Sequence, residues 1–452
     1  MDRSPVKKFG DPRLSKHRKA NFINSLRMMI NLSLELVTNI PRLIKLRSHY
    51  KTHIKSDSPR VVIFSDNIDE INGIAINSRI LVNHLRSEGK TINLIGTAFH
   101  DKDGGFWESN GTLLLPSRFS MEMPGYDENE LAVPKMKLLL RYFKRFPVDI
   151  VELEVPGLGG WLVLLMCKFV RVKVISHYRT DVLGYTKLLV KSKLVNSWVY
   201  FFTKAFCRLT TPVIVPSEDF KTKMNIEMKL RNDQIVQLRR GINLSDFSPK
   251  QRQNNRWASL SGSNLTKTTR FLFAGRISKE KELPFLEDIW KEARTTLDNI
   301  ELCFVGNGPY LAELKQNFDG CPEVSFTGGL HGQDLSTMYA EADFFIFPSG
   351  TDTFGNVVVE SLASGTPALV SNSGGPKMIV KDQLTGWIVD WKNKEEWINA
   401  ISKAEGAKRC SPRLYEAMRI KSFDRSEDYS IGAAGIEWWQ FYQDLHTYPL
   451  KR

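Results

Sequence analysis

One segment, Ser349–Gly365 (SGTDTFGNVVVESLASG), combines two carboxylates with the start of a predicted helix. It follows a strand-like run and ends at a glycine, so residues 355–364 are expected to be helical, with Gly365 ending the helix. Asp352 would then lie in the loop that enters the helix, and Glu360 about one and a half turns inside it.

The start of that helix could bind an anion. The N–H groups of Gly355, Asn356 and Val357 would point outward, and helix N-termini favour phosphate. Two carboxylates beside a phosphate could accept hydrogen bonds from neutral hydroxyls, such as those of a sugar and a ribose.

A positively charged clamp should accompany such a site, and the string GRISKEK supplies one. Arg276 and Lys281 flank the turn between the predicted strand Phe271–Gly275 and the following helix, where they could neutralise a diphosphate. Taken alone, this string would be interpreted as a solvated helix start. Because the chain also contains the carboxylate segment, a diphosphate-binding clamp is favoured.

The elements that must position these groups are short runs rich in Val, Ile and Leu that alternate with helical stretches. The first series of expected strands is 60–66, 91–96, 111–116, 149–155, 173–178 and 213–217; the second is 271–275, 301–306, 324–328, 343–349, 367–372 and 386–390. Residues 249–269 form a polar break between them, which we predict to be a surface insertion. Two such series predict an α/β protein of two doubly wound domains, with the ligand in a cleft between the carboxyl ends of the sheets.

Composition excludes several classes of protein. The chain has 452 residues, of which 42% are hydrophobic and 25% charged, so it is neither disordered, collagen-like nor a coiled coil. Its five cysteines are scattered and include no CxxC pair, which disfavours a disulfide framework or a zinc site and indicates a reducing compartment.

The positive charge is concentrated at the N-terminus. Residues 1–56 hold 13 of the 63 basic residues and only three of the 50 acidic ones, so they carry +10 of the net +13. A nucleic-acid-binding body is therefore disfavoured. Residues 22–46 are amphipathic, interrupted by charges and Pro41, and poorly suited to span a bilayer or to act as a signal peptide. A basic helix on an anionic membrane surface and a helix packed on the body remain equal alternatives.

A second stretch, residues 185–206, combines four lysines with Leu, Trp, Tyr and Phe. We predict a core-facing helix with snorkelling lysines; a second membrane contact is the alternative.

The ordered strings resemble a known family. GRISKEK, VGNGPYLAEL, VSFTGGLHG, TDTFGNVVVESLASGTPAL, GGP and TGWIV, together with INGIA and RRGINLSDFSP, resemble the family 4 (group 1) retaining glycosyltransferases over roughly residues 60–445. The resemblance implies the GT-B fold of two Rossmann-like domains. It is greatest to mannosyl-, glucosyl- and sulfoquinovosyl-transferases of glycolipid and polysaccharide synthesis.

The resemblance also implies roles for matching residues. Asp352 would hold donor-sugar hydroxyls, Glu360 the ribose, and Arg276 with Lys281 the diphosphate. The turn Phe326–His331 would face the base through its backbone. The implied donor-binding set is Gly73, Gly308, Leu330, Phe354, Gly355, Asn356, Val357 and Glu360.

This chain departs from the family pattern in three places. Asp352 stands where the family has Glu. Relatives often carry a histidine where this chain has Arg179; His177, two residues earlier on the same face of the strand, is the alternative catalytic group, unless it is a buried structural histidine. The GGP loop continues with Lys377 and Met378, without the usual glutamate.

Together these features predict a retaining transferase that moves a hexose from a UDP- or GDP-sugar to an acceptor hydroxyl, with no metal and no cofactor. Expected domains are a basic extension (1–58), an acceptor domain (59–245, completed by helix 429–446) and a nucleotide-sugar domain (246–428). The expected acceptor is a membrane glycolipid or polysaccharide precursor, with the chain in the cytoplasm, peripheral on the membrane. A sugar-nucleotide epimerase and a non-catalytic nucleotide-sugar-binding membrane protein are the alternatives.

Overall fold

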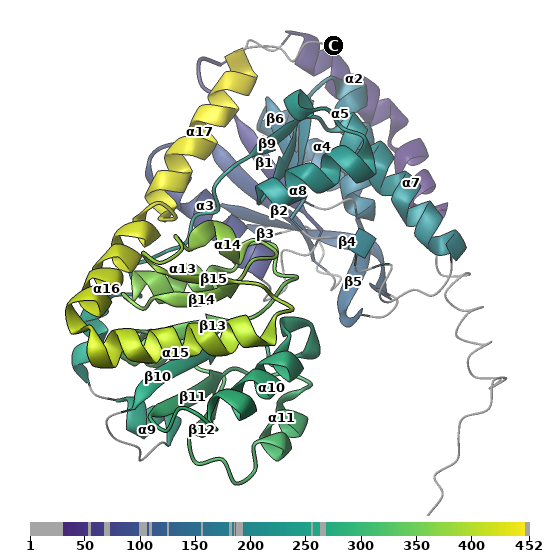
Figure 1. Ribbon diagram of the computed structural model, residues 1–452. Helices are drawn as coiled ribbons and strands as arrows, with labels where there is room; N and C mark the ends of the chain where they lie inside the picture. The colour runs from purple at the N-terminus through teal and green to yellow at the C-terminus, as the bar shows by residue number, and fades with distance from the viewer. Residues whose placement is uncertain are drawn as a thin grey trace, which may run out of the picture. The chain divides into compact units, whose positions relative to one another are not determined.

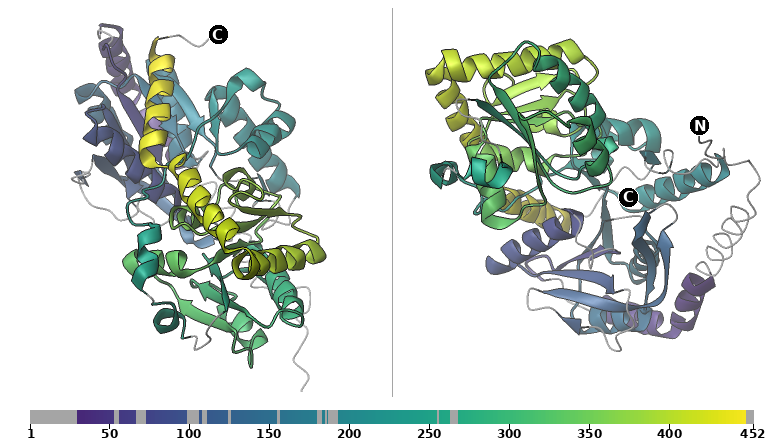
Figure 2. Two further views of the ribbon diagram at one scale, coloured as in Figure 1. Left: turned by 60° about the vertical axis from the view of Figure 1, so that its left-hand side comes forward. Right: turned by 90° about the horizontal axis from the view of Figure 1, so that it is seen from below.

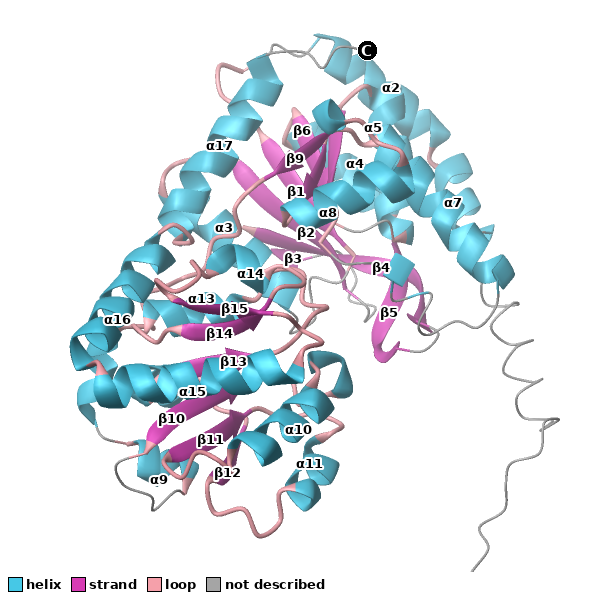
Figure 3. Cartoon of the chain, in the orientation of Figure 1, coloured by secondary structure: helices cyan, strands magenta, loops and turns pink. Residues whose placement is uncertain are grey.

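The computed structural model describes residues 30–52, 56–66, 73–98, 106–107, 111–123, 126–154, 157–179, 183–184, 186, 193–254, 256–262 and 268–447. Residues 1–29 of the expected extension therefore lie outside the described residues. The chain forms two units (Figure 1): the first comprises 1–215, 224–236 and 439–452, and the second 216–223 and 237–438. Figure 3 shows the strands of each unit as one group of arrows flanked by helices.

The first unit is built on a mainly parallel sheet in the order β3-β4-β2-β1-β6-β7-β8-β9, with β5 paired to β4. Its strands are β1 (Val61–Ser65), β2 (Ile92–Ala98), β3 (Phe106–Trp107), β4 (Thr112–Met123), β5 (Tyr126–Pro134), β6 (Ile150–Leu153), β7 (Lys173–His177), β8 (Val213–Val215) and β9 (Ile235–Gln237). Every residue of β1 and β6 is buried, as expected for strands covered on both faces. β2 and β4 lie on one side of β1, and β6 and the later strands lie on the other. The strand order therefore reverses between β1 and β6.

Helices cover both faces of this sheet. They are α3 (Gly73–Ser87), α4 (Met136–Arg145), α5 (Leu158–Val170) and α7 (Lys193–Leu209). Parallel crossovers are right-handed. The crossover through α3 therefore lies on the opposite face from those through α5 and α7, which run in the other direction along the sheet.

Residues 30–38 are helical, and α2 (Ile40–Thr52) follows them. Leu43 and Leu46 of α2 are buried, and α2 contacts α4 and α5. The carboxylate of Glu35 accepts hydrogen bonds from Arg118 (2.6 Å) and from the backbone N–H of Met136 (3.1 Å). This part of the extension therefore packs on the first unit, which is the second of the two alternatives stated above.

The second unit is built on an all-parallel sheet in the order β12-β11-β10-β13-β14-β15. Its strands are β10 (Thr269–Ala274), β11 (Ile300–Val305), β12 (Val324–Gly328), β13 (Phe344–Phe347), β14 (Ala368–Ser371) and β15 (Gly386–Val389). Its longer helices are α8 (Glu218–Lys223), α9 (Trp257–Ser261), α10 (Leu283–Ala293), α11 (Leu311–Asn317), α12 (Gly332–Glu341), α13 (Asn356–Ala363), α14 (Pro376–Ile379), α15 (Lys394–Cys410) and α16 (Pro412–Glu427). Aromatic side chains of β10 and β13 stack in its core: Phe273 lies 5.7 Å from Phe347 between ring centroids.

The last helix, α17 (Ile431–Thr447), begins in the second unit and ends in the first. In Figure 2, α16 and α17 follow each other as two yellow helices.

All twelve expected strands are present, so the predicted α/β class with two doubly wound sheets is confirmed. Within the predicted insertion 249–269, residues 255 and 263–267 lie outside the described residues. The rest differs from a surface insertion: Trp257 of α9 is buried, and Arg252 forms a 2.6 Å ion pair with the buried Asp343. Among the described helices, none combines the length and apolar character needed to cross a bilayer.

Candidate active site

The strand order of the second sheet reverses between β10 and β13, which are hydrogen-bonded neighbours. The loops that follow these two strands therefore emerge side by side at the carboxyl edge, where open α/β sheets bind ligands. Two contacts join the loops. Lys281 Nζ lies 2.5 Å from Asp352 Oδ2, and the Thr351 hydroxyl donates to the carbonyl of Glu280 (3.0 Å). The structure thus brings Lys281 of the clamp together with Asp352, the first carboxylate.

The local backbone fixes the Lys281–Asp352 pair. Lys281 ends a short 3-10 turn that begins at Lys279, and Glu282, at φ 58°, starts α10. The side chains of Lys281 and Asp352 are only 24% and 20% exposed, so both are held at the loop surface with one side open.

Arg276 is placed on the same edge by Gly275, whose φ of 144° turns the chain out of β10. Its side chain is exposed and forms no ion pair with the described residues. The guanidinium is therefore available to an anionic ligand, whereas the Lys281 ammonium already carries a partner.

The start of α13 lies in the second of these loops. Gly355 adopts φ 98° at the N-cap, and the N–H groups of Gly355, Asn356 and Val357 donate to no described acceptor. The side-chain oxygen Oδ1 of Asn356 is buried without a hydrogen-bond partner. Three backbone donors therefore face outward close to Asp352, as an anion site requires.

The GGP loop supports this arrangement from behind. The N–H of Gly375 donates to the carbonyl of Asp352 (2.8 Å). A Cβ atom at Gly374 would lie 2.6 Å from that same oxygen, and one at Gly375 would lie 2.4 Å from the carbonyl oxygen of Thr353. The two glycines thus allow the backbone to pack directly on the loop that carries Asp352.

Glu360 projects from α13 and accepts a hydrogen bond from the Tyr339 hydroxyl (2.9 Å). Desolvation raises the pKa of Glu360 to about 7, against the opposing effect of that hydrogen bond. This carboxylate therefore titrates close to neutral pH.

Three loops at this edge are joined through glycines. The N–H of Gly306 donates to the carbonyl of Gly328 (2.8 Å), and the N–H of Ile277 to that of Asn307 (2.9 Å). A Cβ at Gly308 would lie 2.2 Å from the carbonyl oxygen of Ile277. Gly308 therefore permits close packing of the Arg276 loop. Leu330 follows β12 and packs, partly buried, against the core.

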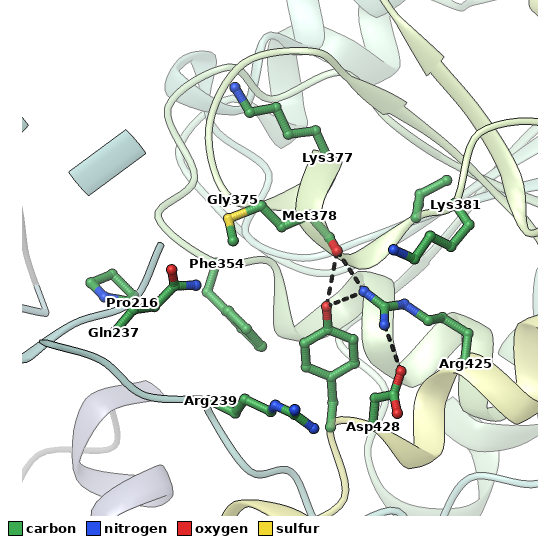
Figure 4. A pocket seen from close by; sticks show the side chains of 12 residues that line it. Pro216, Gln237, Arg239, Phe354, Gly375, Lys377, Met378, Lys381, Arg425 and Asp428 are labelled. Carbon is green, nitrogen blue, oxygen red and sulfur yellow. Dashed lines mark hydrogen bonds and ion pairs between the residues drawn. The ribbon is translucent and has the colours of Figure 1, made fainter. Parts of the chain in front are cut away.

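Phe354, two residues after Asp352, lies in the interior of the unit. It is buried and packs edge-on against Tyr429, with ring centroids 5.8 Å apart. The ring also forms a wall of a pocket of about 450 Å³ (Figure 4), which the sequence reasoning did not foresee. The pocket is lined by Pro216, Gln237, Arg239, Phe354, Gly375, Lys377, Met378, Val380, Lys381, Arg425, Asp428 and Tyr429.

Met378, which departs from the family pattern, lines this pocket. The Met378 carbonyl accepts hydrogen bonds from Arg425 (2.8 Å) and from the Tyr429 hydroxyl (2.9 Å), and Arg425 also pairs with Asp428 (2.5 Å). The side chain of Met378 lies on the pocket's wall (Figure 4). These hydrogen bonds hold the backbone of the GGP loop against Arg425 of α16 and Tyr429. They are made to the Met378 carbonyl, so they do not depend on the side chain at position 378.

The first unit contains a second group of candidates, at the carboxyl ends of β6 and β7. Arg179 Nε donates to His177 Nδ1 (2.9 Å), and Arg179 Nη2 pairs with Glu154 (3.0 Å). Glu152 Oε1 lies 3.2 Å from His177 Nδ1, and its other oxygen accepts a hydrogen bond from the Tyr442 hydroxyl (2.6 Å). The structure brings His177 and Arg179 together in one buried cluster.

Burial raises the pKa of Glu152 to about 7, although the nearby Arg179 and Tyr442 oppose the rise. Glu152 and Glu154 were not singled out from the sequence. The signal was present: two acids alternate with apolar residues in an otherwise buried strand, DIVELEV. Buried carboxylates need partners, and Arg179, Tyr442 and Ser78 supply them.

Gly73 is the first residue of α3. Asp66, which follows β1, was also missed. It is buried beside the start of α5, where a Cβ at Gly157 or Gly159 would come within 2.0 Å of its carboxylate oxygens. Burial raises the pKa of Asp66 to about 7. The described residues contain no cluster of three or more His, Cys, Asp or Glu side chains suited to a metal ion.

Comparison with known proteins places these features in a family context. Residues 256–420 match the family model described as glycosyl transferases group 1. The chain is 27% identical to a sulfoquinovosyl transferase of Arabidopsis thaliana, over 73% of this chain and 63% of that protein. It is 26% identical to an alpha-monoglucosyldiacylglycerol synthase of Streptococcus pneumoniae (72% and 74% covered) and to a GDP-mannose-dependent alpha-mannosyltransferase of Corynebacterium glutamicum (76% and 80% covered).

Solved structures show the same fold. Sucrose-phosphate synthase from Thermosynechococcus elongatus superposes with a TM-score of 0.67 at 20% identity, over 86% of this chain and 99% of that one. Anabaena HepE in complex with UDP gives a TM-score of 0.65 at 14% identity, over 86% and 100%. The expected GT-B fold is confirmed.

Proposed function

We propose, from the premise that this chain is a GT-B glycosyltransferase with a group 1 glycosyl transferase domain, that it moves a hexose from a UDP- or GDP-linked donor to an acceptor hydroxyl. The observation that carries the proposal is the Lys281–Asp352 pair, which joins the two loops at the reversal of the second sheet beside the start of α13. A sugar diphosphate requires a cation and free backbone N–H groups for its phosphate oxygens. It also requires a carboxylate that accepts hydrogen bonds from the sugar hydroxyls, and all three lie at this edge.

Each group has a role in this reaction. Arg276, Lys281 and the amides of Gly355, Asn356 and Val357 would hold the diphosphate, and Asp352 would accept hydrogen bonds from sugar hydroxyls. Glu360 would accept hydrogen bonds from the ribose, and the backbone near Leu330 would face the base.

We propose a retaining, metal-independent mechanism. The bond between the sugar C1 and the phosphate oxygen breaks, and the acceptor oxygen bonds to C1 on the same face. The acceptor hydroxyl proton passes to the departing phosphate oxygen, so no protein nucleophile is needed. The Lys281 ammonium and the Arg276 guanidinium stabilise the charge that develops on the leaving group.

The names of three relatives support the donor and acceptor classes. One is called GDP-mannose-dependent, another a monoglucosyldiacylglycerol synthase and the third a sulfoquinovosyl transferase. We therefore propose a membrane glycolipid or polysaccharide precursor as acceptor, and a location on the cytoplasmic face of a membrane. An epimerase or a non-catalytic binding protein is not favoured, because these relatives are named as transferases or synthases.

The test is sugar transfer from a panel of UDP- and GDP-sugars into a membrane lipid extract, in the presence of EDTA. We expect one donor to be used, the anomeric configuration of the product to be retained, and Asp352→Ala to abolish transfer. Inversion would contradict the mechanism. The absence of transfer from every donor, with folded protein and both lipid and soluble acceptors, would contradict the function.

A further inference from the structure

Helix α7 of the first unit exposes large apolar side chains. Val195, Trp198 and Phe201 are 45%, 53% and 65% exposed, and their spacing of three residues places them on one side of the helix. The opposite side is anchored, because Thr203 and Cys207, one turn apart on it, are buried in the unit. Of the stretch 185–206, for which a core-facing helix was predicted, residue 185 and residues 187–192 lie outside the described residues. The described part presents an apolar side to solvent, which differs from that prediction.

The exposed side chains are held in place. The ring of Trp198 packs on Phe202 with centroids 3.9 Å apart, and Phe202 packs edge-on against Trp161 of α5 at 5.8 Å. α7 lies at the outer edge of its unit in Figures 1 and 2. Ordered aromatic side chains in solvent cost free energy in the isolated protein, so they point to a partner.

α5 extends the same character. Its Leu165 and Phe169 are 40% and 38% exposed, with Lys168 between them, and the guanidinium of Arg47 from α2 lies 5.2 Å from the Phe169 ring centroid. We call Val195, Trp198 and Phe201 of α7 the apolar face.

The charge on the surrounding helices is of one sign. α4, α5 and α7 contain eight Lys and Arg residues and no Asp or Glu. Beyond residue 56 the chain carries only +3 of its net +13, so these helices concentrate positive charge that acidic residues balance elsewhere. On α7 itself the cations are Lys193, Lys204 and Arg208, which flank the exposed aromatic rings.

Exposed aromatic rings flanked by cations indicate a lipid bilayer as the partner. Aromatic rings prefer the boundary between headgroups and acyl chains, and flanking lysines reach back to lipid phosphates. A second copy of the chain is disfavoured, because a symmetric contact through α7 would set Lys193, Lys204 and Arg208 against the same three cations, and α7 contains no Asp or Glu.

We propose that the apolar face docks the first unit on an anionic bilayer, with Trp198 and Phe201 entering the interface and Lys193, Lys204 and Arg208 contacting lipid phosphates. The contact is additional to any made by residues 1–56 and, resting on the proposed function, would bring the enzyme to its lipid acceptor. Each Lys or Arg near the surface adds to an attraction that salt screens.

The experiment is flotation of the full chain with phosphatidylcholine vesicles, with and without phosphatidylglycerol. We expect binding that depends on phosphatidylglycerol and falls about tenfold in Trp198→Glu/Phe201→Glu, since binding strength follows the buried apolar area and the charge. The matched control is Ile76→Glu, because Ile76 is 44% exposed on α3, which lies on the opposite face of the sheet from α7. Phe201→Ser is a milder variant in case the double variant folds poorly.

Unchanged binding of folded variants, equal loss in the Ile76 control, or binding indifferent to phosphatidylglycerol would overturn the proposal. So would a dimer in size-exclusion chromatography that the double variant dissociates, because the face would then bind a second copy. An assay of sugar transfer to a short-chain, water-soluble acceptor separates the docking proposal from the proposed function. The double variant should keep this transfer activity. If the protein binds vesicles but transfers sugar to no acceptor, only the proposed function is contradicted.

Discussion

The Lys281 ammonium and the Asp352 carboxylate neutralise each other at the edge of the second sheet. A diphosphate bound there would add negative charge beside Asp352, and Arg276, which has no ion pair among the described residues, supplies the compensating cation. The pair can thus bind a phosphate oxygen through Lys281 while Asp352 keeps its remaining lone pairs for sugar hydroxyls.

We expect Lys281→Ala to lower kcat about 10²–10³-fold with the fold intact, because removing one stabiliser of developing charge has that effect. Lys279→Ala is the matched control: Lys279 belongs to the same turn but pairs with Glu313 (2.9 Å). Steady-state kinetics and circular dichroism of both variants check this. Equal losses in the two variants would show that the turn, and not the charge at position 281, matters.

Glu360 makes donor binding depend on pH. Its pKa is about 7 in the free protein, and ribose hydroxyls bind the ionised form, so affinity should rise with pH up to about 7 and then level off, by at most about tenfold per pH unit. Stability has the opposite sign: the raised pKa favours folding below the ordinary value of 4.5, and that contribution is lost as the pH rises through about 7.

Calorimetric titration with a nucleotide sugar, whose diphosphate diester does not titrate in this range, should show the slope. Glu360→Gln should remove it and weaken binding at high pH. A slope that persists in the variant would exclude Glu360 as its origin.

At the scale of elements, sequence patterns predicted those strands whose residues are apolar on both faces. All twelve such runs form strands. β5 (YDENELAVP) was missed because its acidic residues interrupt the apolar pattern, and the strand is stabilised by its pairing with β4. β3 and β9 were also missed, because two residues and the run Ile-Val-Gln carry too little pattern, whereas the equally short β8 is apolar throughout. The burial of Trp257 in a polar stretch depends on a partner far along the chain, because the backbone N–H of Trp257 donates to the carboxylate of Glu341 (3.2 Å), 84 positions away.

The carboxyl-edge loops should be sensitive to added bulk. A Cβ at Gly306, where φ is 141°, would lie 1.9 Å from the carbonyl oxygen of Gly275. We expect Gly306→Ala to lower the free energy of unfolding of the second unit by about 3 kcal/mol or more, combining backbone strain with overpacking. Denaturant titration measures this.

Gly320→Ala is the control for the backbone contribution, because Gly320 also has a positive φ, of 75°, but has open space around its Cβ position. It should cost only about 1 kcal/mol. A comparable loss in both variants would mean that the loops can separate to accommodate the methyl group.

At the scale of the whole molecule, the candidate site was predictable where its residues lie in contiguous strings. Arg276, Lys281, Asp352 and Glu360 could be found because each string is short and the strand order sets the strings side by side. The Glu152–Tyr442 contact could not, because its partners are 290 positions apart and nothing in either local pattern indicates the other.

The two units should respond differently to nucleotide. If the second unit holds the donor, UDP or GDP at about 100 times its Kd should stabilise that unit by about 2.7 kcal/mol. Hydrogen exchange should then slow in β10 and β13 more than in β1 and β6. Protection that is equal in both units, or greater in the first, would contradict the assignment of the donor to the second unit.

The split of α17 between the units has a consequence for biosynthesis. The first unit receives the buried Trp439, Tyr442 and Leu445 only after the ribosome has made residues 237–438 of the second unit. Until then Glu152, already in place on β6, lacks the hydroxyl that satisfies it. The first unit is thus completed only after the second has been synthesised, and a nascent chain that stops shortly before residue 439 would leave the first unit with an open core for chaperones and proteases to recognise.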